Sequence, residues 1–167
     1  MNTTEATAID LKGTWAIDNS HSNLQFTVTH LVISQVNGHF GSYDGTIVNE
    51  DEDLNNAKIN FNIDSASINT GIEMRDNHLK SDDFFNAEAY PQIKFTSANI
   101  EKTGENSYDI NGEMTIRDVP RPATFKAKIG GVAVDGYGNT KLGMRVTTSI
   151  NRFDYGLKWN QLTEAGG

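Results

Sequence analysis

Cysteine is absent from the 167-residue chain. Its absence excludes disulfide bonds, cysteine-ligated zinc, iron–sulfur clusters and thiol catalysis. Long apolar runs are absent too, so no stretch of the sequence is suited to span a bilayer as a helix. We therefore expect no stable insertion into a membrane.

Basic residues are scarce relative to acidic ones. The chain has 14 lysines and arginines against 22 aspartates and glutamates, which gives a formal net charge of −8. An acidic surface repels nucleic-acid phosphates and anionic lipid headgroups, so neither is expected as a general partner. Solubility is a sufficient explanation for this charge.

The N-terminus lacks the basic start and apolar core of a signal peptide. We predict a flexible N-terminal segment over residues 1–12, followed by a single domain over residues 13–167. As written, the chain is expected in the cytoplasm. A mature periplasmic chain whose signal peptide had been removed would look the same.

The chain is rich in segments where apolar and polar residues alternate. Leu24, Phe26, Val28 and His30 share one face of a predicted strand, and polar residues occupy the other. The same period of two predicts strands at 58–64, 92–96, 108–116, 124–129 and 141–150, and shorter ones at 15–17 and 43–48. Turns rich in glycine, asparagine and aspartate are predicted at 51–56, 102–106, 130–131 and 135–139.

About eight strands of this kind predict an all-β fold, an extended antiparallel barrel with room for one ligand. The apolar residues between Thr70 and Tyr90 do not alternate. A short helix is predicted at 72–80, a second one capped by residues 81–83, and a short helical turn at 30–35. One or two short helices therefore accompany the barrel.

The four histidines match no common catalytic or metal-binding pattern. The chain has no HExxH motif, no histidine pair spaced i, i+4 and no serine in a GxSxG turn. We therefore predict no catalytic residue, no metal and no cofactor.

The densest polar cluster is the segment 75–79. In one interpretation it forms a rim where Arg75 binds a polar head group. In the other it is structural, with Asp76 capping a turn and Arg75 pairing with a carboxylate. Arg152 either faces the barrel mouth or bonds backbone carbonyls at a turn, and residues 117–118 are predicted to form a plain turn.

The apolar strand faces leave two arrangements open. They can interlock as a solid core, or they can surround a space that holds a ligand. Composition does not separate these two cases.

Several motifs resemble the YceI-like, or polyisoprenoid-binding, family. The matching segments are 15–22, 26–31, 38–40, 67–71, 75–85, 90–95, 112–117, 150–157 and 159–160. They follow in the right order over nearly all of residues 13–167. The resemblance implies a lipocalin-like barrel with an amphipathic or isoprenoid lipid in its pore and no known catalytic activity.

Two departures from the family pattern stand out. Asp118-Val119-Pro120 replaces the usual Gly-Val-Thr run, which should alter one turn. The sequence also ends at Gly167, where family members usually continue into a final strand. Without that strand a barrel edge would expose unpaired backbone groups, which a homodimer could cover.

We therefore predict a protein that is not an enzyme and that binds a long apolar lipid, as a carrier, a store or a sensor. The residues predicted to face the pore are Leu24, Phe26, Val28, Ile59, Phe61, Ile63, Ile93, Phe95, Met114, Ile116, Phe125, Met144 and Val146. Those predicted at the head-group end are His30, Arg75, His78, Arg152 and Trp159.

Two rival hypotheses stay open at this point. One is a small hydrolase or isomerase that uses His78 and Asp76 in the pocket. The other is an interaction protein with a filled core, which would have no tunnel.

Overall fold

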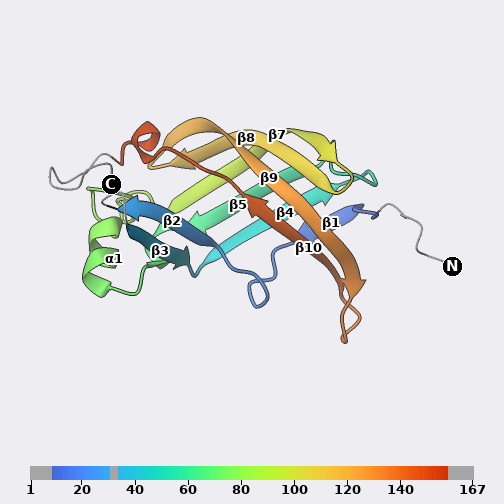
Figure 1. Ribbon diagram of the computed structural model, residues 1–167, viewed down its shortest axis with the longest axis horizontal. Coiled ribbons are helices and arrows are strands. Elements are labelled where there is room, and N and C mark those ends of the chain that lie inside the picture. Colours follow the sequence, from blue (N-terminus) through green and yellow to red (C-terminus); the bar gives the residue numbers. More distant parts are fainter. Residues whose placement is uncertain (1–8, 31–33, 158–167) are drawn as a thin grey trace.

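The computed structural model describes residues 9–30 and 34–157. Its main element is a seven-stranded sheet in which all neighbours are antiparallel. In sheet order the strands are β1 (Gly13–Ala16), β4 (Tyr43–Asn49), β5 (Lys58–Asp64), β7 (Gln92–Gly104), β8 (Ser107–Ile116), β9 (Val119–Val134) and β10 (Thr140–Thr147). The sheet curls into a nearly closed barrel, and β1 and β10 are its two edges (Figure 1).

A smaller sheet lies at one end of the barrel, beside the helix (Figure 1). Its order is β2 (Gln25–His30), β3 (Ser34–Phe40) and β6 (Ile68–Asn69). The helices are η1 (Ser65–Ser67), α1 (Glu73–Lys80) and η2 (Arg152–Tyr155). Within the described part of the chain, no helix is both long and apolar enough to cross a membrane.

The alternation of the sequence places one face of each strand inside the barrel. On β5, for example, Ile59 and Ile63 are buried while Lys58 and Asn60 are exposed. The inner faces of β5, β7 and β9 meet in an aromatic cluster of Phe61, Phe95 and Phe125. The sheet thus has a wet outside and an apolar inside, as the period of two predicts.

The all-β barrel and the helix at 72–80 are confirmed, the helix starting at Glu73. The predicted helical turn at 30–35 is wrong for Ser34 and Gln35, which begin strand β3, whereas residues 31–33 lie outside the described residues. That strand is mostly polar, so alternation could not reveal it. The second helix, predicted after residues 81–83, is also wrong, because residues 81–89 form successive turns.

The turn predicted at Gly130–Gly131 is a bulge inside β9. The register shifts there, so that Gly143 pairs with Gly131 while Met144 pairs with Ile129. Gly131 has a φ of 156°, which favours glycine. The bulge lets β9 continue beyond the barrel wall into a long hairpin with β10.

Residues 9–12 contact the barrel. Leu11 is buried, and its amide donates to the Glu52 carbonyl at 2.9 Å. Its own carbonyl accepts from Trp15 Nε1 at 3.0 Å and from Asn49 Nδ2 at 2.9 Å. Residues 1–8 of the segment expected to be flexible lie outside the described residues.

Candidate functional site

The interior of the barrel is a cavity of about 2280 Å³. It extends from the β9–β10 hairpin to the end that carries α1 and η2. All thirteen residues predicted to face the pore line it: Leu24, Phe26, Val28, Ile59, Phe61, Ile63, Ile93, Phe95, Met114, Ile116, Phe125, Met144 and Val146. Seven of the thirteen are buried and pack against one another as the wall of this space, namely Ile59, Ile63, Ile93, Phe95, Met114, Ile116 and Phe125. The barrel therefore combines a packed apolar layer with an open interior.

The aromatic cluster forms part of the cavity wall. Phe61 stacks on Phe95 with a centroid distance of 5.2 Å, and Phe125 meets Phe95 edge-on at 4.7 Å. Phe95 is 1% exposed, whereas Phe61 is only half-buried and lines the cavity. Phe95 thus anchors the wall, and Phe61 supplies an aromatic face to the interior.

Thr70, between β6 and α1, organises the first turn of the helix and fixes Arg75. Its amide and hydroxyl donate to Asp76 Oδ1 at 2.8 and 2.6 Å. The Arg75 guanidinium donates to the Thr70 hydroxyl at 2.8 Å and to the Thr70 carbonyl at 2.9 Å. Arg75 lines the cavity, and two of its guanidinium nitrogens bond Thr70, while Asp76 ties α1 to the preceding chain.

His78 lies at the same end of the cavity. Its Nε2 is 2.8 Å from Asp83 Oδ2, and its ring packs edge-on against Phe84 at 5.1 Å. Asp76, the partner that the enzyme hypothesis assigned to His78, bonds Thr70 instead. The structure therefore does not join His78 and Asp76 as an acid–base pair.

Arg152 combines both of its predicted interpretations. It lines the cavity, and it donates to the Leu157 carbonyl at 3.3 Å. Its guanidinium also lies over the Phe153 ring, 4.7 Å from the centroid. The preceding Asn151 caps η2 by accepting from the Phe153 amide, so a local motif holds Arg152 at the mouth.

The other two residues predicted at the head-group end cannot be placed. The backbone of His30 ends β2, but its side chain lies outside the described residues, as does all of Trp159.

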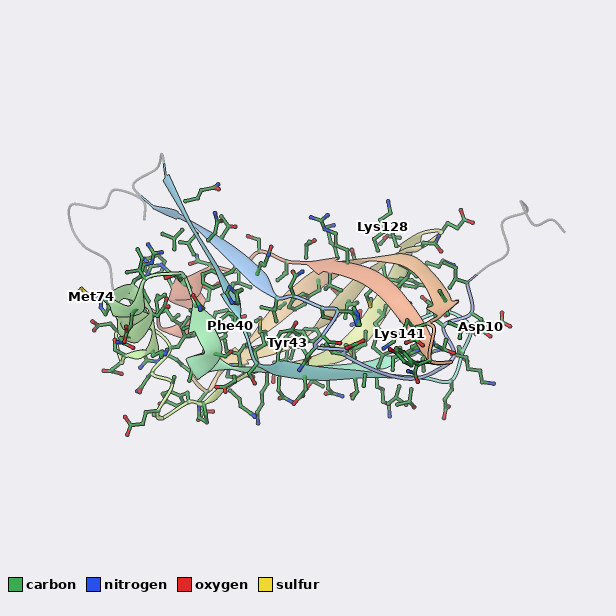
Figure 2. The ribbon with its side chains drawn as sticks, turned by 90° about the horizontal axis from the view of Figure 1, so that it is seen from below. Asp10, Phe40, Tyr43, Met74, Lys128 and Lys141 are labelled. Carbon is green, nitrogen blue, oxygen red and sulfur yellow. The ribbon has the colours of Figure 1, made fainter. Side chains whose placement is uncertain are left out.

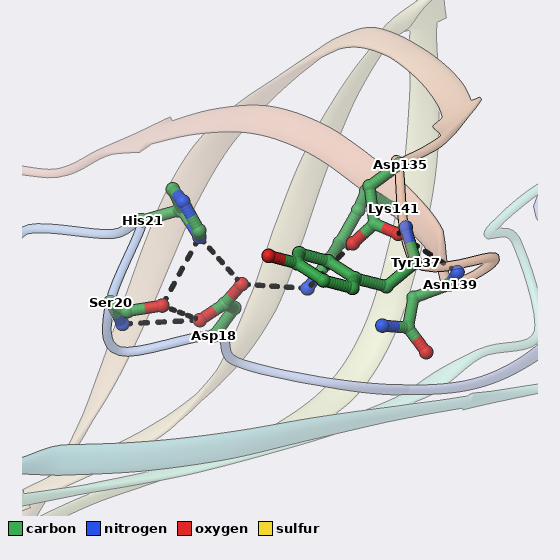
Figure 3. Close-up of polar contacts among 7 residues, drawn as sticks. All are labelled: Asp18, Ser20, His21, Asp135, Tyr137, Asn139 and Lys141. Carbon is green, nitrogen blue, oxygen red and sulfur yellow. Dashed lines mark hydrogen bonds and ion pairs between the residues drawn. The ribbon is translucent and has the colours of Figure 1, made fainter.

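The opposite end of the cavity carries a closed polar network between the loop after β1 and the β9–β10 hairpin (Figure 3). Lys141 Nζ lies 2.7 Å from Asp18 Oδ2 and 3.9 Å from Asp135 Oδ2. Asp18 also accepts from the Ser20 hydroxyl at 2.6 Å, and its Oδ2 lies 2.9 Å from His21 Nδ1. This network joins the two edges of the main sheet at one end.

The charges in this network stabilise one another. The hydrogen bond from Lys141, followed by those from Ser20 and His21, holds the pKa of Asp18 well below its ordinary value. The same bond raises the pKa of Lys141. Backbone amides of Asn139 and Tyr137 lower the pKa of Asp135. The site stays ionised at neutral pH with its charges largely paired.

The two ends of the cavity therefore carry different polar side chains. Arg75 and Arg152 line the α1 end, where Asp76 bonds Thr70 and Asp83 bonds His78. At the hairpin end, the lining residues Asp18 and Lys141 neutralise each other. Across residues 9–30 and 34–157, no group of three acidic or histidine side chains could hold a metal ion.

Several residues that line the cavity are not among those predicted to face the pore. They are Trp15, Ile17, Phe40, Tyr43, Ile72, Met74, Leu79, Phe84, Phe85, Leu142, Phe153 and Leu157. Trp15, Tyr43 and Leu142 belong to strands that were predicted, so extending the period of two along those strands would have found them. Phe84 and Phe85 lie in turns, where no period applies.

Comparison with known proteins gives consistent matches along the chain. The family model for the YceI-like domain matches residues 15–167. A UPF0312 protein from Staphylococcus aureus (strain MSSA476) is 34% identical over 154 residues, which cover 92% of this chain and 87% of that protein. The crystal structure of the Campylobacter jejuni YCEI protein is 36% identical and superimposes with a TM-score of 0.66, covering 84% of this chain and 82% of that one. Burkholderia cenocepacia BcnA shares the fold at 23% identity, with a TM-score of 0.66 over 71% of this chain and 74% of that one.

Proposed function

The chain belongs to the YceI-like family, and on that premise we propose that it binds a long-chain isoprenoid or another amphipathic lipid inside the barrel. The observation that carries the proposal is the apolar cavity of about 2280 Å³. Pockets for drug-sized ligands hold roughly 300–1,000 Å³. A space this large and this long suits an extended hydrocarbon chain better than a compact metabolite.

Apolar burial supplies the driving force for such binding. Each buried CH₂ group contributes about 0.8 kcal/mol, so one five-carbon isoprene unit contributes roughly 3–4 kcal/mol before ordering costs. Loss of ligand motion offsets part of this gain. A few isoprene units are still enough for tight binding, so the wall needs no charged contact with the tail.

The unequal ends of the cavity orient the ligand in this proposal. The polar head lies at the α1 end, where the guanidinium groups of Arg75 and Arg152 line the mouth. The tail runs along Phe61 toward the hairpin end, where Asp18 and Lys141 satisfy each other. The protein does no covalent chemistry on the lipid and serves as a carrier, a store or a sensor.

Native mass spectrometry of protein purified without detergent tests this function. We expect a retained mass of several hundred daltons that is released on denaturation. Protein that carries no such mass and takes up no fluorescent lipid in a titration would refute the proposal.

Two adjacent residues of β5 provide matched variants. Phe61→Arg places a charge on the cavity wall, whereas Asn62→Arg places it on the outer face, beside Asp44. We expect the first variant to lose lipid uptake and the second to keep it. Met144→Arg places a charge on the cavity wall from the edge strand β10, which has a neighbouring strand on one side only. A substitution there should disturb folding less than one at Phe61. Loss of lipid uptake in both variants would therefore not be explained by misfolding of the Phe61 variant.

The variant Arg75→Ala tests how much the head group of the lipid contributes to binding compared with its tail. Because the tail supplies most of the binding energy, this variant should keep most of its affinity for the lipid in the same titration. A loss as large as that of Phe61→Arg would mean that the head group dominates binding.

A further inference from the structure

A second, smaller hollow lies on the outer surface of the barrel. It has a volume of about 290 Å³ and is formed by side chains of β7 to β10. Three cations line it, Lys126, Lys128 and Arg145, together with the hydroxyls of Ser107 and Thr147. Figure 2 shows Lys128 pointing away from the barrel.

The register of the sheet puts two of these cations directly opposite each other. Lys128 on β9 pairs with Arg145 on β10, and both side chains are exposed. Like charges in directly opposed positions destabilise a sheet. Within the described part of the chain, neither of the two has a carboxylate oxygen within 4.0 Å.

The adjacent set of residues paired across β7, β8 and β9 has a different arrangement of charges. There Asp109 on β8 faces Glu101 on β7, but Lys126 lies 3.8 Å from Asp109 as a counter-ion. The three cations and Asp109 give the hollow a formal charge of +2 in a chain whose net charge is −8. The repulsion between Lys128 and Arg145 therefore remains uncompensated on an otherwise acidic protein.

We propose that this hollow binds a phosphate group carried by a phosphate ester. A guanidinium offers paired donors that match two phosphate oxygens, and a lysine ammonium adds a compact charge. Ser107 pairs with Lys128 across the strands, and Thr147 pairs with Lys126, so the hydroxyl donors flank the cations. A bound dianion relieves the repulsion between Lys128 and Arg145.

The position of Arg145 relates the hollow to the lipid cavity. This residue lines both spaces, and it lies on β10, one of the two edges of the main sheet. If the phosphate belongs to a lipid headgroup, its binding brings the open edge of the barrel against a lipid surface. If it belongs to a small ester, the site acts independently of membranes. In either case, a negative result for this hollow would not contradict the proposal that the cavity binds a lipid.

The test compares wild type with the double variant Lys128→Gln/Arg145→Gln. A matched control, Lys58→Gln/Lys94→Gln, removes two exposed lysines from the outer faces of β5 and β7. Two readouts are used: the shift in melting temperature with inorganic phosphate against chloride at equal ionic strength, and sedimentation with vesicles of phosphatidylcholine with or without phosphatidic acid.

We expect wild type and the control to respond to phosphate, to the anionic vesicles, or to both. The double variant should lose that response, with vesicle binding about tenfold weaker. Without phosphate, it should melt at the same temperature as wild type or higher, because the like-charge pair is gone.

The pattern of responses also identifies the source of the phosphate. A response to inorganic phosphate alone assigns a small ester, and a response to vesicles alone assigns a lipid headgroup. The proposal is overturned if wild type responds to neither, or if the double variant responds as wild type does.

Discussion

The wall formed by β5, β7, β8 and β9 and the seam between β1 and β10 belong to one sheet but are held in different ways. Every strand of the wall has a hydrogen-bonded neighbour on both sides, whereas β1 and β10 each have one. The wall buries Phe95 at 1% exposure, while Val146 on β10 and Ile150 beyond it are each 43% exposed. The wall is thus the better packed part of the sheet, and we expect the barrel to open more readily at the seam.

The largest loss of unfolding free energy is expected from removing a buried side chain of the wall. Phe95→Ala removes a side chain that contacts both Phe61 and Phe125, and it should cost about 3–5 kcal/mol of unfolding free energy. Val146→Ala at the seam should cost less than about 1 kcal/mol, because its side chain is already partly in water. Urea denaturation measures both values, and equal losses would contradict the contrast between wall and seam.

A backbone position within the wall gives the next largest effect. A Cβ atom at Gly112 on β8 would lie 2.2 Å from the Thr96 carbonyl oxygen and 2.7 Å from Phe95 Cζ. We expect Gly112→Ala to cost about 1–3 kcal/mol in the same urea experiment, since the strand or the ring must shift.

Gly136 in the β9–β10 hairpin turn is the matched control. A Cβ atom there meets no atom within 4 Å, and the turn lies outside the wall. Gly136→Ala should therefore be neutral or slightly stabilising. A Gly112→Ala variant as stable as this control would show that the wall is less tightly packed than the structure indicates.

The wall is also the part that the sequence predicts best. Its strands alternate between their bulges, so the period of two identifies all four strands and the residues on their inner faces, but it covers only residues 92–96 of β7 and 124–129 of β9. The polar strand β3 and the bulge at Gly130–Gly131 were missed, because a polar strand shows no alternation and paired glycines mark a turn as readily as a bulge. Local sequence patterns thus predict the strands of this barrel, except at β3 and at the bulge, where hydrogen bonding between strands and not side-chain alternation determines the structure.

The contacts at the cavity ends were much harder to predict. Arg75 and Arg152 were recognised as candidates, but their partners Thr70 and Leu157 depend on how α1 and η2 fold back locally. Asp18 and Lys141 are 123 residues apart, and no local pattern in the sequence links them. Such pairs follow from the curvature of the whole sheet, which no single segment encodes.

The Asp18–Lys141 ion pair gives a smaller, kinetic effect at the seam. Lys141 lies at the start of β10 and Asp18 lies two residues after β1, so the pair ties the two sheet edges together (Figure 3). We expect Lys141→Met to speed the release of a fluorescent lipid about two- to fivefold in stopped-flow experiments, with little change in affinity.

Lys126→Met is the control for that experiment. It removes a lysine from a different ion pair, 3.8 Å from Asp109, within the wall. Release from this variant should match wild type. If both variants accelerate release equally, the effect reflects a general loss of charge and not an opening of the seam.

The pH dependence of the same pair follows from its two shifted pKa values. Because the folded state lowers the pKa of Asp18, its contribution to stability is complete above the ordinary value of 3.8 and is lost as the pH falls through the lower folded value. Because the pKa of Lys141 is raised, its contribution is complete below the ordinary value of 10.5 and is lost as the pH rises through the higher folded value. The difference in melting temperature between wild type and Lys141→Met should therefore stay constant from about pH 5 to 9 and shrink in stronger acid. A difference that already changes between pH 5 and 7 would show that a group other than Asp18 and Lys141 controls the pH dependence.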